Sequence, residues 1–281
     1  MKIVAVVNQK GGVAKTTTAV NLGACLAERG MRTLLVDLDP QANMTTGLGI
    51  EWYSLPAALH SVLLDYEETP LKSILTRIED LPLYLAPGHL DLAHVETILA
   101  PRPDSAYRLR NAFENHFEEF DYDWVLIDCP PSLGTLTQNA IVASSHLLIP
   151  TEPKYYAFAG MDTLNKMIVG LTKGLRFKVD LLGVLVTMYE RGTKLHQTIA
   201  AEIRERFGDK VFDTMIYKNV RLSESEVEGK PIILFDRKAS GAQNYEALAE
   251  EILERVGMPH YNANELPFHQ FNFKEIENHA N

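Results

Sequence analysis

Residues 8–17 read NQKGGVAKTT, a segment in which two lysines frame a pair of glycines and a pair of threonines follows. The segment comes directly after Lys2–Val7, an apolar run rich in β-branched residues, which predicts a buried strand. It leads into Thr16–Arg29, where apolar side chains recur at helical spacing, which predicts a helix. A glycine-containing loop between a strand and a helix predicts a phosphate-binding site, because backbone N–H groups and the helix N-terminus face the anion.

The alternation of strands and helices continues along the chain beyond this loop. It predicts a doubly wound α/β fold, a mostly parallel sheet flanked by helices, within one P-loop domain over residues 1–257, with a polar tail at 258–281 that the sequence leaves unassigned. Further strands are predicted at Thr33–Asp37, Leu83–Ala86, Trp124–Asp128, His146–Pro150 and Leu181–Thr187. Further helices are predicted at Ala106–Phe117, Thr135–Ala143, Met161–Leu171, Leu195–Phe207 and Tyr245–Val256.

Ligands of such sheets bind at the carboxyl ends of the strands, so the loops that begin there are expected to converge. Within the first loop, Lys15 is placed to reach terminal phosphates and Thr16 to ligate Mg²⁺. The pattern G-x-x-x-x-G-K-[ST] is not met, because Gln9 and Ala14 occupy its two glycine positions. The prediction therefore depends on the additional lysine, Lys10, and on the other loops.

Three aspartates end two of the predicted strands. Asp37 and Asp39 follow one buried strand, where a carboxylate can order Mg²⁺ or orient a water molecule for attack on a phosphate, although aspartates at strand ends also serve as helix caps. Asp128 ends another strand in the arrangement of a Walker B carboxylate. The stiff loop Pro130–Gly134 that follows is positioned to sense the terminal phosphate.

The composition argues against a protein that binds nucleic acid over its whole surface, a membrane-spanning protein, a secreted protein and a disulfide-rich protein. The chain has 281 residues and a net charge of −10, so any contact with DNA is expected from a local basic patch. The sequence contains no apolar run of about 20 residues and no signal-peptide cleavage region, which predicts a cytosolic protein. Cys25 and Cys129 are predicted to be buried free thiols. The nine histidines show no H-x-x-x-H or comparable spacing, so Mg²⁺ is the only metal implied.

Taken together, these motifs resemble the ParA/MinD family of deviant Walker ATPases, and most closely its ParA/Soj branch, which partitions chromosomes and plasmids. The resemblance spans most of the chain. It rests on Asn8–Thr18, Val36–Gly49 (VDLDPQANMTTGLG), Asp128–Gly134 (DCPPSLG), Asn219–Glu224 (NVRLSE) and Gly229–Phe235 (GKPIILF).

The resemblance implies a homodimer that sandwiches two ATP molecules. Lys10 of each subunit would reach the phosphates bound by the other, and Gly11 would lie where the backbones come closest. Lys10, Lys15 and Asp39 would be catalytic, with Asp39 positioning the water, and Mg²⁺ would be held by Thr16, Asp39 and Asp128. Nucleotide contacts are implied for Lys10, Gly11, Gly12, Val13, Ala14, Lys15, Thr16, Thr17, Asp128, Pro130, Met188, Tyr217 and Asn219.

Two positions depart from the family pattern. Ala14 stands where relatives usually have glycine before the P-loop lysine, so the added methyl group is either tolerated or slows the site. Tyr217 stands near the expected adenine site, where relatives commonly carry proline. The preference for ATP over GTP follows from the resemblance alone.

The resemblance also implies that the ATP dimer binds DNA without sequence preference. The matching cations are Arg191, Lys194, Lys218 and Arg221, although on an acidic protein such scattered cations are commonly solvated surface residues. A ParB-like protein or another cargo adaptor would stimulate hydrolysis, and the protein would act at the nucleoid.

Alternative functions on the same fold remain open at this point. A MinD-like membrane protein would need a basic amphipathic helix at its C-terminus, whereas Tyr245–Val256 is acidic, so no membrane binding is expected. Positioning of a protein cargo, as for carboxysomes, chemoreceptors or flagella, is not distinguished from DNA partitioning. An iron–sulfur carrier would need paired interface cysteines, and a repressor would need a helix-turn-helix before Asn8, where the sequence leaves no room.

Overall fold

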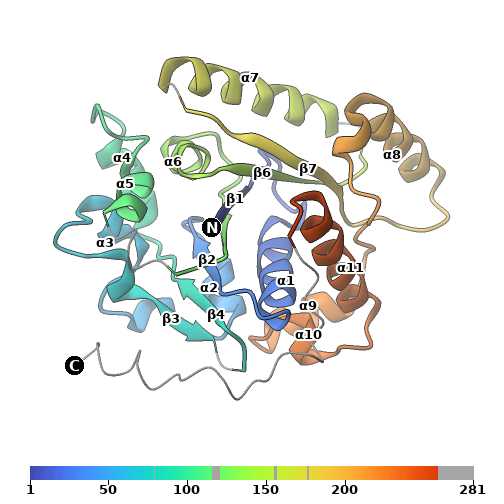
Figure 1. The fold of residues 1–281 in the computed structure, drawn as a ribbon, viewed down its shortest axis with the longest axis horizontal. Coiled ribbons are helices and arrows are strands. Elements are labelled where there is room, and N and C mark those ends of the chain that lie inside the picture. Colours follow the sequence, from blue (N-terminus) through green and yellow to red (C-terminus); the bar gives the residue numbers. More distant parts are fainter. Residues whose placement is uncertain (79, 116–120, 155–156, 176, 259–281) are drawn as a thin grey trace.

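The computed structural model describes residues 1–258 except residues 79, 116–120, 155–156 and 176. Its centre is a seven-stranded sheet in the order β3-β4-β2-β5-β1-β6-β7, in which every pairing is parallel except the antiparallel pairing of β3 with β4 (Figure 1). The strands are β1 (Lys2–Val6), β2 (Thr33–Asp37), β3 (Thr76–Ile78), β4 (Leu83–Ala86), β5 (Trp124–Asp128), β6 (His146–Thr151) and β7 (Asp180–Val186).

Helices cover both faces of the sheet. The α-helices are α1 (Lys15–Glu28), α2 (Asn43–Gly47), α3 (Leu59–Leu64), α4 (Leu92–Leu99), α5 (Arg108–Glu114), α6 (Thr135–Ala143), α7 (Ala157–Leu175), α8 (Lys194–Phe207), α9 (Val220–Val227), α10 (Ile232–Phe235) and α11 (Ser240–Arg255). Short 3₁₀ turns lie at Trp52–Ser54, Leu71–Ile74 and Gly208–Lys210. No helix within the described part of the chain is long and apolar enough to cross a bilayer.

The sheet separates two apolar cores, because successive side chains of a strand point to opposite faces. In β2, Leu34 and Val36 pack into the core shared with α3 to α8, whereas Leu35 packs into the core shared with α1, α2 and α9 to α11. Every residue of β2 and β5 is buried, as expected for central parallel strands covered on both faces. The two cores hold the central strand ends in fixed positions.

The predicted doubly wound fold is confirmed, and each predicted strand is present within one or two residues. β3 and the short helices α2, α3, α4, α9 and α10 were not predicted. Cys25 and Cys129 are buried free thiols, as predicted. The predicted tail at 258–281 lies, apart from Met258, outside the described residues, as does the end of the helix predicted to reach Phe117.

Candidate nucleotide site

The predicted loops meet at the carboxyl edge of three adjacent strands. β5 lies between β1 and β2, and its last residue, Asp128, pairs in register with Val6 on one side and Asp37 on the other. The loop at residues 8–17 therefore begins beside both carboxylates. Sequence positions more than 120 residues apart are brought together by the parallel register, as the strand-end argument predicted.

The loop between β1 and α1 is shaped by its own hydrogen bonds. The backbone N–H of Lys10 donates to Asn8 Oδ1 at 2.9 Å, and Asn8 Nδ2 donates to the Pro150 carbonyl at 2.8 Å. Gly12 and Ala14 both have positive φ angles, of 70° and 62°. This left-handed conformation suits glycine, so the departure at Ala14 places an L side chain where the loop prefers none.

Lys15 and Thr16 begin helix α1 and point into the site. The Lys15 Nζ donates to the Lys10 carbonyl at 3.2 Å, which folds the buried lysine back across the loop. The Thr16 hydroxyl donates to Asp128 Oδ2 at 2.6 Å. The loop therefore presents an ammonium group and a hydroxyl–carboxylate pair next to a helix N-terminus. Together these groups can bind a phosphate and the metal ion that accompanies it.

Asp37 and Asp128 are fully buried, and each has one oxygen, Oδ1, without a hydrogen-bond partner. The other oxygen of Asp37 accepts from the Thr45 N–H at 2.9 Å and the Thr45 hydroxyl at 2.7 Å. The pKa of Asp37 is raised to about 6, mainly because the carboxyl group is buried; the Thr45 hydrogen bonds lower the pKa and the nearby Asp39 carboxylate raises it. Burial raises the pKa of Asp128 well above its usual range, and the charge of Asp37 adds to this.

These orphaned oxygens fit a hard divalent cation, which takes carboxylate and hydroxyl oxygens as ligands. Thr16 and Asp128 would hold Mg²⁺, and the ion would neutralise phosphate charge. Asp39, the third predicted metal residue, is 7% exposed, and its Oδ1 accepts the Gln41 N–H at 3.0 Å. Asp37, anchored to Thr45, fixes the course of the loop that carries Asp39.

A cavity of about 470 Å³ opens beside the phosphate-binding loop. Lys10 lies at this cavity with its Nζ 3.2 Å from Glu152 Oε2. Partial burial of Glu152 raises its pKa, but hydrogen bonds from Lys154 and Lys10 outweigh that effect, so the net shift is downward. The cavity is lined by Lys10, Gly11, Gly12, Glu152, Lys154, Met188, Glu190, His196 and Lys218.

The remaining predicted nucleotide contacts are divided between the cavity and its surroundings. Pro130 is buried at the strand end, and Met188 lines the cavity with a φ of 52°. The Tyr217 ring instead packs under Arg191, whose Cζ lies 4.3 Å from the ring centroid. Asn219 caps α9 by accepting the Arg221 N–H, so its side chain is already committed to local structure.

Sequence reasoning missed two residues of the site, Thr45 and Glu152. Thr45 lies within the segment Val36–Gly49, but no sequence motif marks it as a site residue. Its role is a hydrogen bond from its hydroxyl to Asp37, eight residues earlier in the chain. Glu152 directly follows β6, next to the strand that was predicted to end at Pro150. Its place one residue beyond a strand at the ligand edge was a signal that could have found it.

The predicted DNA-binding cations gather from two segments. A parallel bridge between Tyr189 and Tyr217 brings the loop after β7 beside the segment before α9. Lys218 pairs with Glu190 at 2.7 Å, and Arg221 pairs with Asp236 at 2.9 Å and with Glu224. Lys194 begins α8 and is exposed. Carboxylates therefore offset part of the positive charge in this conformation.

The central parallel sheet, the phosphate-binding loop after β1 and the Thr16–Asp128 pair define a P-loop ATPase, and the second loop lysine places it among the deviant Walker type. Residues 1–181 match the AAA_31 family, described as an AAA domain. The chain is 44% identical over 251 residues to the sporulation initiation inhibitor protein Soj of Bacillus subtilis, covering 89% of this chain and 98% of that protein.

Two further relatives agree with this class. The chromosome partitioning protein ParA of Caulobacter vibrioides is 41% identical over 255 residues, which cover 91% of this chain and 95% of that protein. The structure of cobyrinic acid a,c-diamide synthase from Mycobacterium smegmatis with bound ADP and magnesium is 33% identical, has a TM-score of 0.79, and overlaps 93% of this chain and 99% of that one. The chain belongs to the ParA/Soj branch of the ParA/MinD family, and it is an ATPase that uses ATP and Mg²⁺.

Proposed function

We propose that this ATPase is a nucleotide-controlled partitioning switch. ATP would assemble two copies into a sandwich, the ATP dimer would bind DNA without sequence preference, and hydrolysis would release it. A ParB-like protein or another cargo adaptor would stimulate hydrolysis and move with the retreating ATPase over the nucleoid in the cytoplasm. The two partitioning relatives, ParA and Soj, support this proposal.

The observation that carries the proposal is the position of Lys10. Lys15 already supplies the ammonium group inside its own loop, whereas the Lys10 side chain is 36% exposed and extends to Glu152 at the cavity. Lys10 is therefore not needed inside its own phosphate-binding loop. Its ammonium group can instead bind the phosphates of the ATP held by the other subunit of a face-to-face dimer. Glu152 then holds Lys10 until ATP arrives, and because this pair is partly exposed its strength is modest, on the order of 1 kcal/mol.

Hydrolysis would depend on Asp39. It lies on the loop that Asp37 and Thr45 anchor, next to the phosphate-binding loop, and it is the least buried of the three site aspartates. A carboxylate in that place orients water through a hydrogen bond rather than through the metal ion. Asp39→Ala is therefore expected to bind ATP and to remain in the ATP state.

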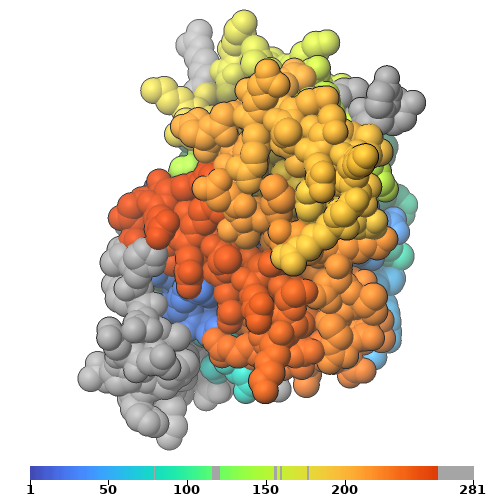
Figure 2. All heavy atoms as spheres, turned by 90° about the vertical axis from the view of Figure 1, so that its right-hand side faces the viewer, coloured from blue at the N-terminus to red at the C-terminus, as the bar shows by residue number. Residues whose placement is uncertain are grey.

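DNA binding would use Arg191, Lys194, Lys218 and Arg221. Figure 2 views the side of the molecule that carries α8, α9 and α11, and the gold segment around residues 188–193 lies there beside orange segments. The ion pairs of Lys218 and Arg221 are exposed and therefore weak, so phosphates can displace them. Two such patches in a dimer would double the number of counterions released.

The test is binding to nonspecific duplex DNA without nucleotide, with ADP, with ATP–Mg²⁺ and with a nonhydrolysable analogue, at two salt concentrations. Binding is expected only with ATP or the analogue, and it should weaken steeply with salt. Arg221→Glu should abolish binding while ATP-dependent dimerisation persists. The matched control is Arg110→Glu on α5, which replaces another exposed arginine paired with a glutamate one turn away and should leave DNA binding unchanged.

DNA binding that ignores nucleotide, or that Arg221→Glu and Arg110→Glu affect equally, would refute the proposed interface. If no nucleotide state binds DNA, the partitioning role is wrong, and anionic vesicles and protein partners become the next ligands to assay. Turnover of Asp39→Ala at the wild-type rate would separately remove Asp39 from catalysis.

A further inference from the structure

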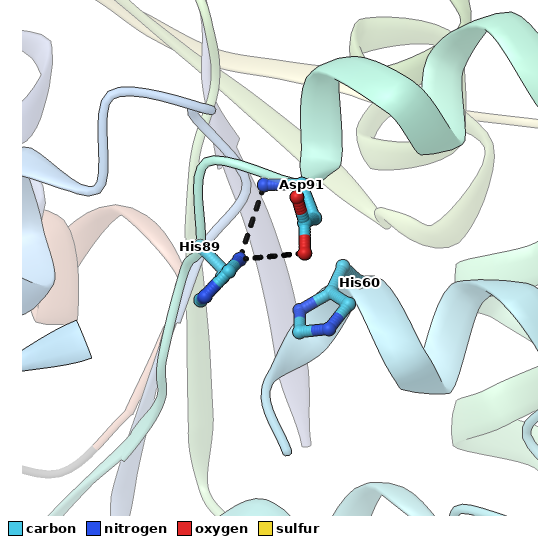
Figure 3. A group of neighbouring side chains, drawn as sticks. All are labelled: His60, His89 and Asp91. Carbon is cyan, nitrogen blue, oxygen red and sulfur yellow. Dashed lines mark hydrogen bonds and ion pairs between the residues drawn. The ribbon is translucent and has the colours of Figure 1, made fainter. Parts of the chain in front are cut away.

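The structure brings together three side chains that the sequence holds up to 31 residues apart. His60 is the second residue of α3, and His89 and Asp91 belong to the loop between β4 and α4. One ligand atom from each of these residues lies within 4.8 Å of the other two. Figure 3 shows the two imidazole rings and the carboxylate facing a common space. Local histidine spacing gave no indication of this cluster.

The hydrogen bonds around His60 leave one ring nitrogen available. Its Nε2 lies 3.1 Å from the Ser61 hydroxyl, whereas its Nδ1 is buried and has no partner. An imidazole with one nitrogen hydrogen-bonded to a hydroxyl and the other buried without a partner is the arrangement of a metal-ligating histidine with its outer support.

His89 and Asp91 also present electron pairs to the same space. The Asp91 backbone N–H donates to His89 Nδ1 at 3.1 Å, so a metal ion at this nitrogen would take the place of that hydrogen bond. The same nitrogen lies 3.3 Å from the carboxylate oxygen Oδ2 of Asp91. A positive charge beside the two atoms, carried either by a ring proton or by a bound cation, would offset their repulsion.

We propose that His60, His89 and Asp91 form a binding site for a borderline divalent metal ion of the Zn²⁺ class. Two imidazole nitrogens and one carboxylate oxygen are a ligand set that Zn²⁺ accepts, with the fourth position open to water. Mg²⁺ prefers six oxygen ligands and is excluded by this set. The site is therefore separate in chemistry from the Mg²⁺ site beside Thr16 and Asp128.

The cluster is connected to the nucleotide site through short contacts. Gly88, the neighbour of His89, donates its N–H to the Thr45 hydroxyl at 2.8 Å, and Thr45 in turn holds Asp37. A Cβ at Gly88 would lie 2.8 Å from the Asp37 carboxyl carbon, so the two segments touch. A metal ion that ties α3 to the β4–α4 loop would stiffen one wall of the ATP site.

The test is calorimetric titration of the tag-free protein with Zn²⁺, in excess Mg²⁺ and without nucleotide, together with the visible spectrum of the Co²⁺-loaded protein. One equivalent is expected to bind, and Co²⁺ should give the strong absorption of a four-coordinate site. His60→Ala and His89→Ala should each weaken binding by at least about 10-fold to 100-fold, the loss caused even by removing a supporting residue. His94→Ala is the matched control, because His94 is 82% exposed and its Nδ1 lies 3.4 Å from Asp91 Oδ1, whereas His89 approaches the other carboxylate oxygen.

Folding of the variants is checked by their melting temperatures without metal, with His60→Gln as a second replacement that keeps a polar side chain. Zn²⁺ should raise the melting temperature of the wild type and of His94→Ala but not of the other variants. Equal Zn²⁺ affinity in all variants, a six-coordinate Co²⁺ spectrum, or loss of binding in His94→Ala would overturn the proposed ligand set. Absence of binding to the wild type would overturn the site altogether.

Discussion

Ala14 carries the clearest local conflict between sequence and backbone. Its φ of 62° lies in the left-handed region, which costs an L residue roughly 1–2 kcal/mol relative to glycine. Ala14→Gly is therefore expected to stabilise the nucleotide-free protein by about 1 kcal/mol and to raise its melting temperature by roughly 2–4 °C. Ala247→Gly, at an exposed position inside α11, is the control and should destabilise by about 1 kcal/mol. Equal effects of the two changes would show that Ala14 is not strained.

The raised pKa of Asp37 predicts how the free energy of unfolding depends on pH. Its pKa is about 6 in the folded protein against 3.8 as the reference, so the unfolded chain releases this proton first and stability falls as pH rises from about 4 to about 6. At pH 7 the penalty is on the order of 3 kcal/mol. Asp37→Asn should stabilise the nucleotide-free and Mg²⁺-free protein there by roughly 1–2 kcal/mol, because an unpaired amide NH₂ takes back part of the gain.

The measurement is urea unfolding from pH 4 to pH 8 for the wild type, Asp37→Asn and the exposed control Asp209→Asn. The advantage of Asp37→Asn should shrink as pH falls and be lost by about pH 4, where the carboxyl group is protonated in the folded protein and is close to half protonated in the unfolded chain. A difference between Asp37→Asn and the wild type that stays constant over this range would contradict the assignment of the raised pKa to Asp37.

At the scale of elements, helix α1 packs unusually close to the sheet. A Cβ at Gly23 would lie 2.6 Å from Leu35 Cδ2 and 3.3 Å from Leu126 Cδ1. Gly23→Ala should therefore destabilise by about 1–3 kcal/mol, the usual effect of overpacking a core. Gly170→Ala in α7 is the matched control, because nothing lies within 4 Å of its Cβ and the change should stabilise by about 0.5–1 kcal/mol. Chemical denaturation of both variants gives the answer, and similar signs would contradict the close packing.

The sequence predicted those helices and strands whose pattern of apolar residues follows directly from which side chains are buried. β2 and β5 are buried along their whole length, so their apolar runs stand out, and the helix predicted at Thr135–Ala143 has those bounds in the structure. β3 has three residues with one side toward solvent, too few for a period to show. Helices α3 and α9 are six and eight residues long, and α9 begins because Asn219 caps it rather than because of its apolar spacing.

At the scale of the whole molecule, substitution of Gly11 tests whether two copies of the protein form the proposed face-to-face dimer. A Cβ there would meet only Pro131 Cβ at 3.9 Å, so the isolated chain has room for a side chain. Gly11→Val is expected to bind ATP normally but to remain monomeric in light scattering with the nonhydrolysable analogue. Gly12→Val is the contrasting variant, since its φ of 70° makes any side chain strained and nucleotide binding itself should weaken. Dimerisation of Gly11→Val would refute the face-to-face arrangement.

The nucleotide site was largely predictable because parallel strands end at one edge, so strand-end residues such as Lys15, Asp39 and Asp128 had to converge. The rest depended on contacts between segments without a common motif. The ion pair between Lys10 and Glu152 joins residues 142 positions apart, and the His60–His89 cluster joins helix α3 to the loop between β4 and α4. Residue spacing along the chain does not predict these contacts, because they depend on how α3 and the strand ends pack in three dimensions.

The central position of β1 determines when the site can form during synthesis. Its neighbour β5 pairs Trp124 with Lys2, and Thr16 of the phosphate-binding loop lies 112 residues before its partner Asp128, so the ribosome must make this stretch before the loop gains that carboxylate. At about 5–20 residues per second, the loop waits roughly 6–25 s after it is made. Nascent chains that end before β5 therefore lack the carboxylate that pairs with Thr16, and during this interval the apolar β1 segment lacks the strand that covers one of its edges.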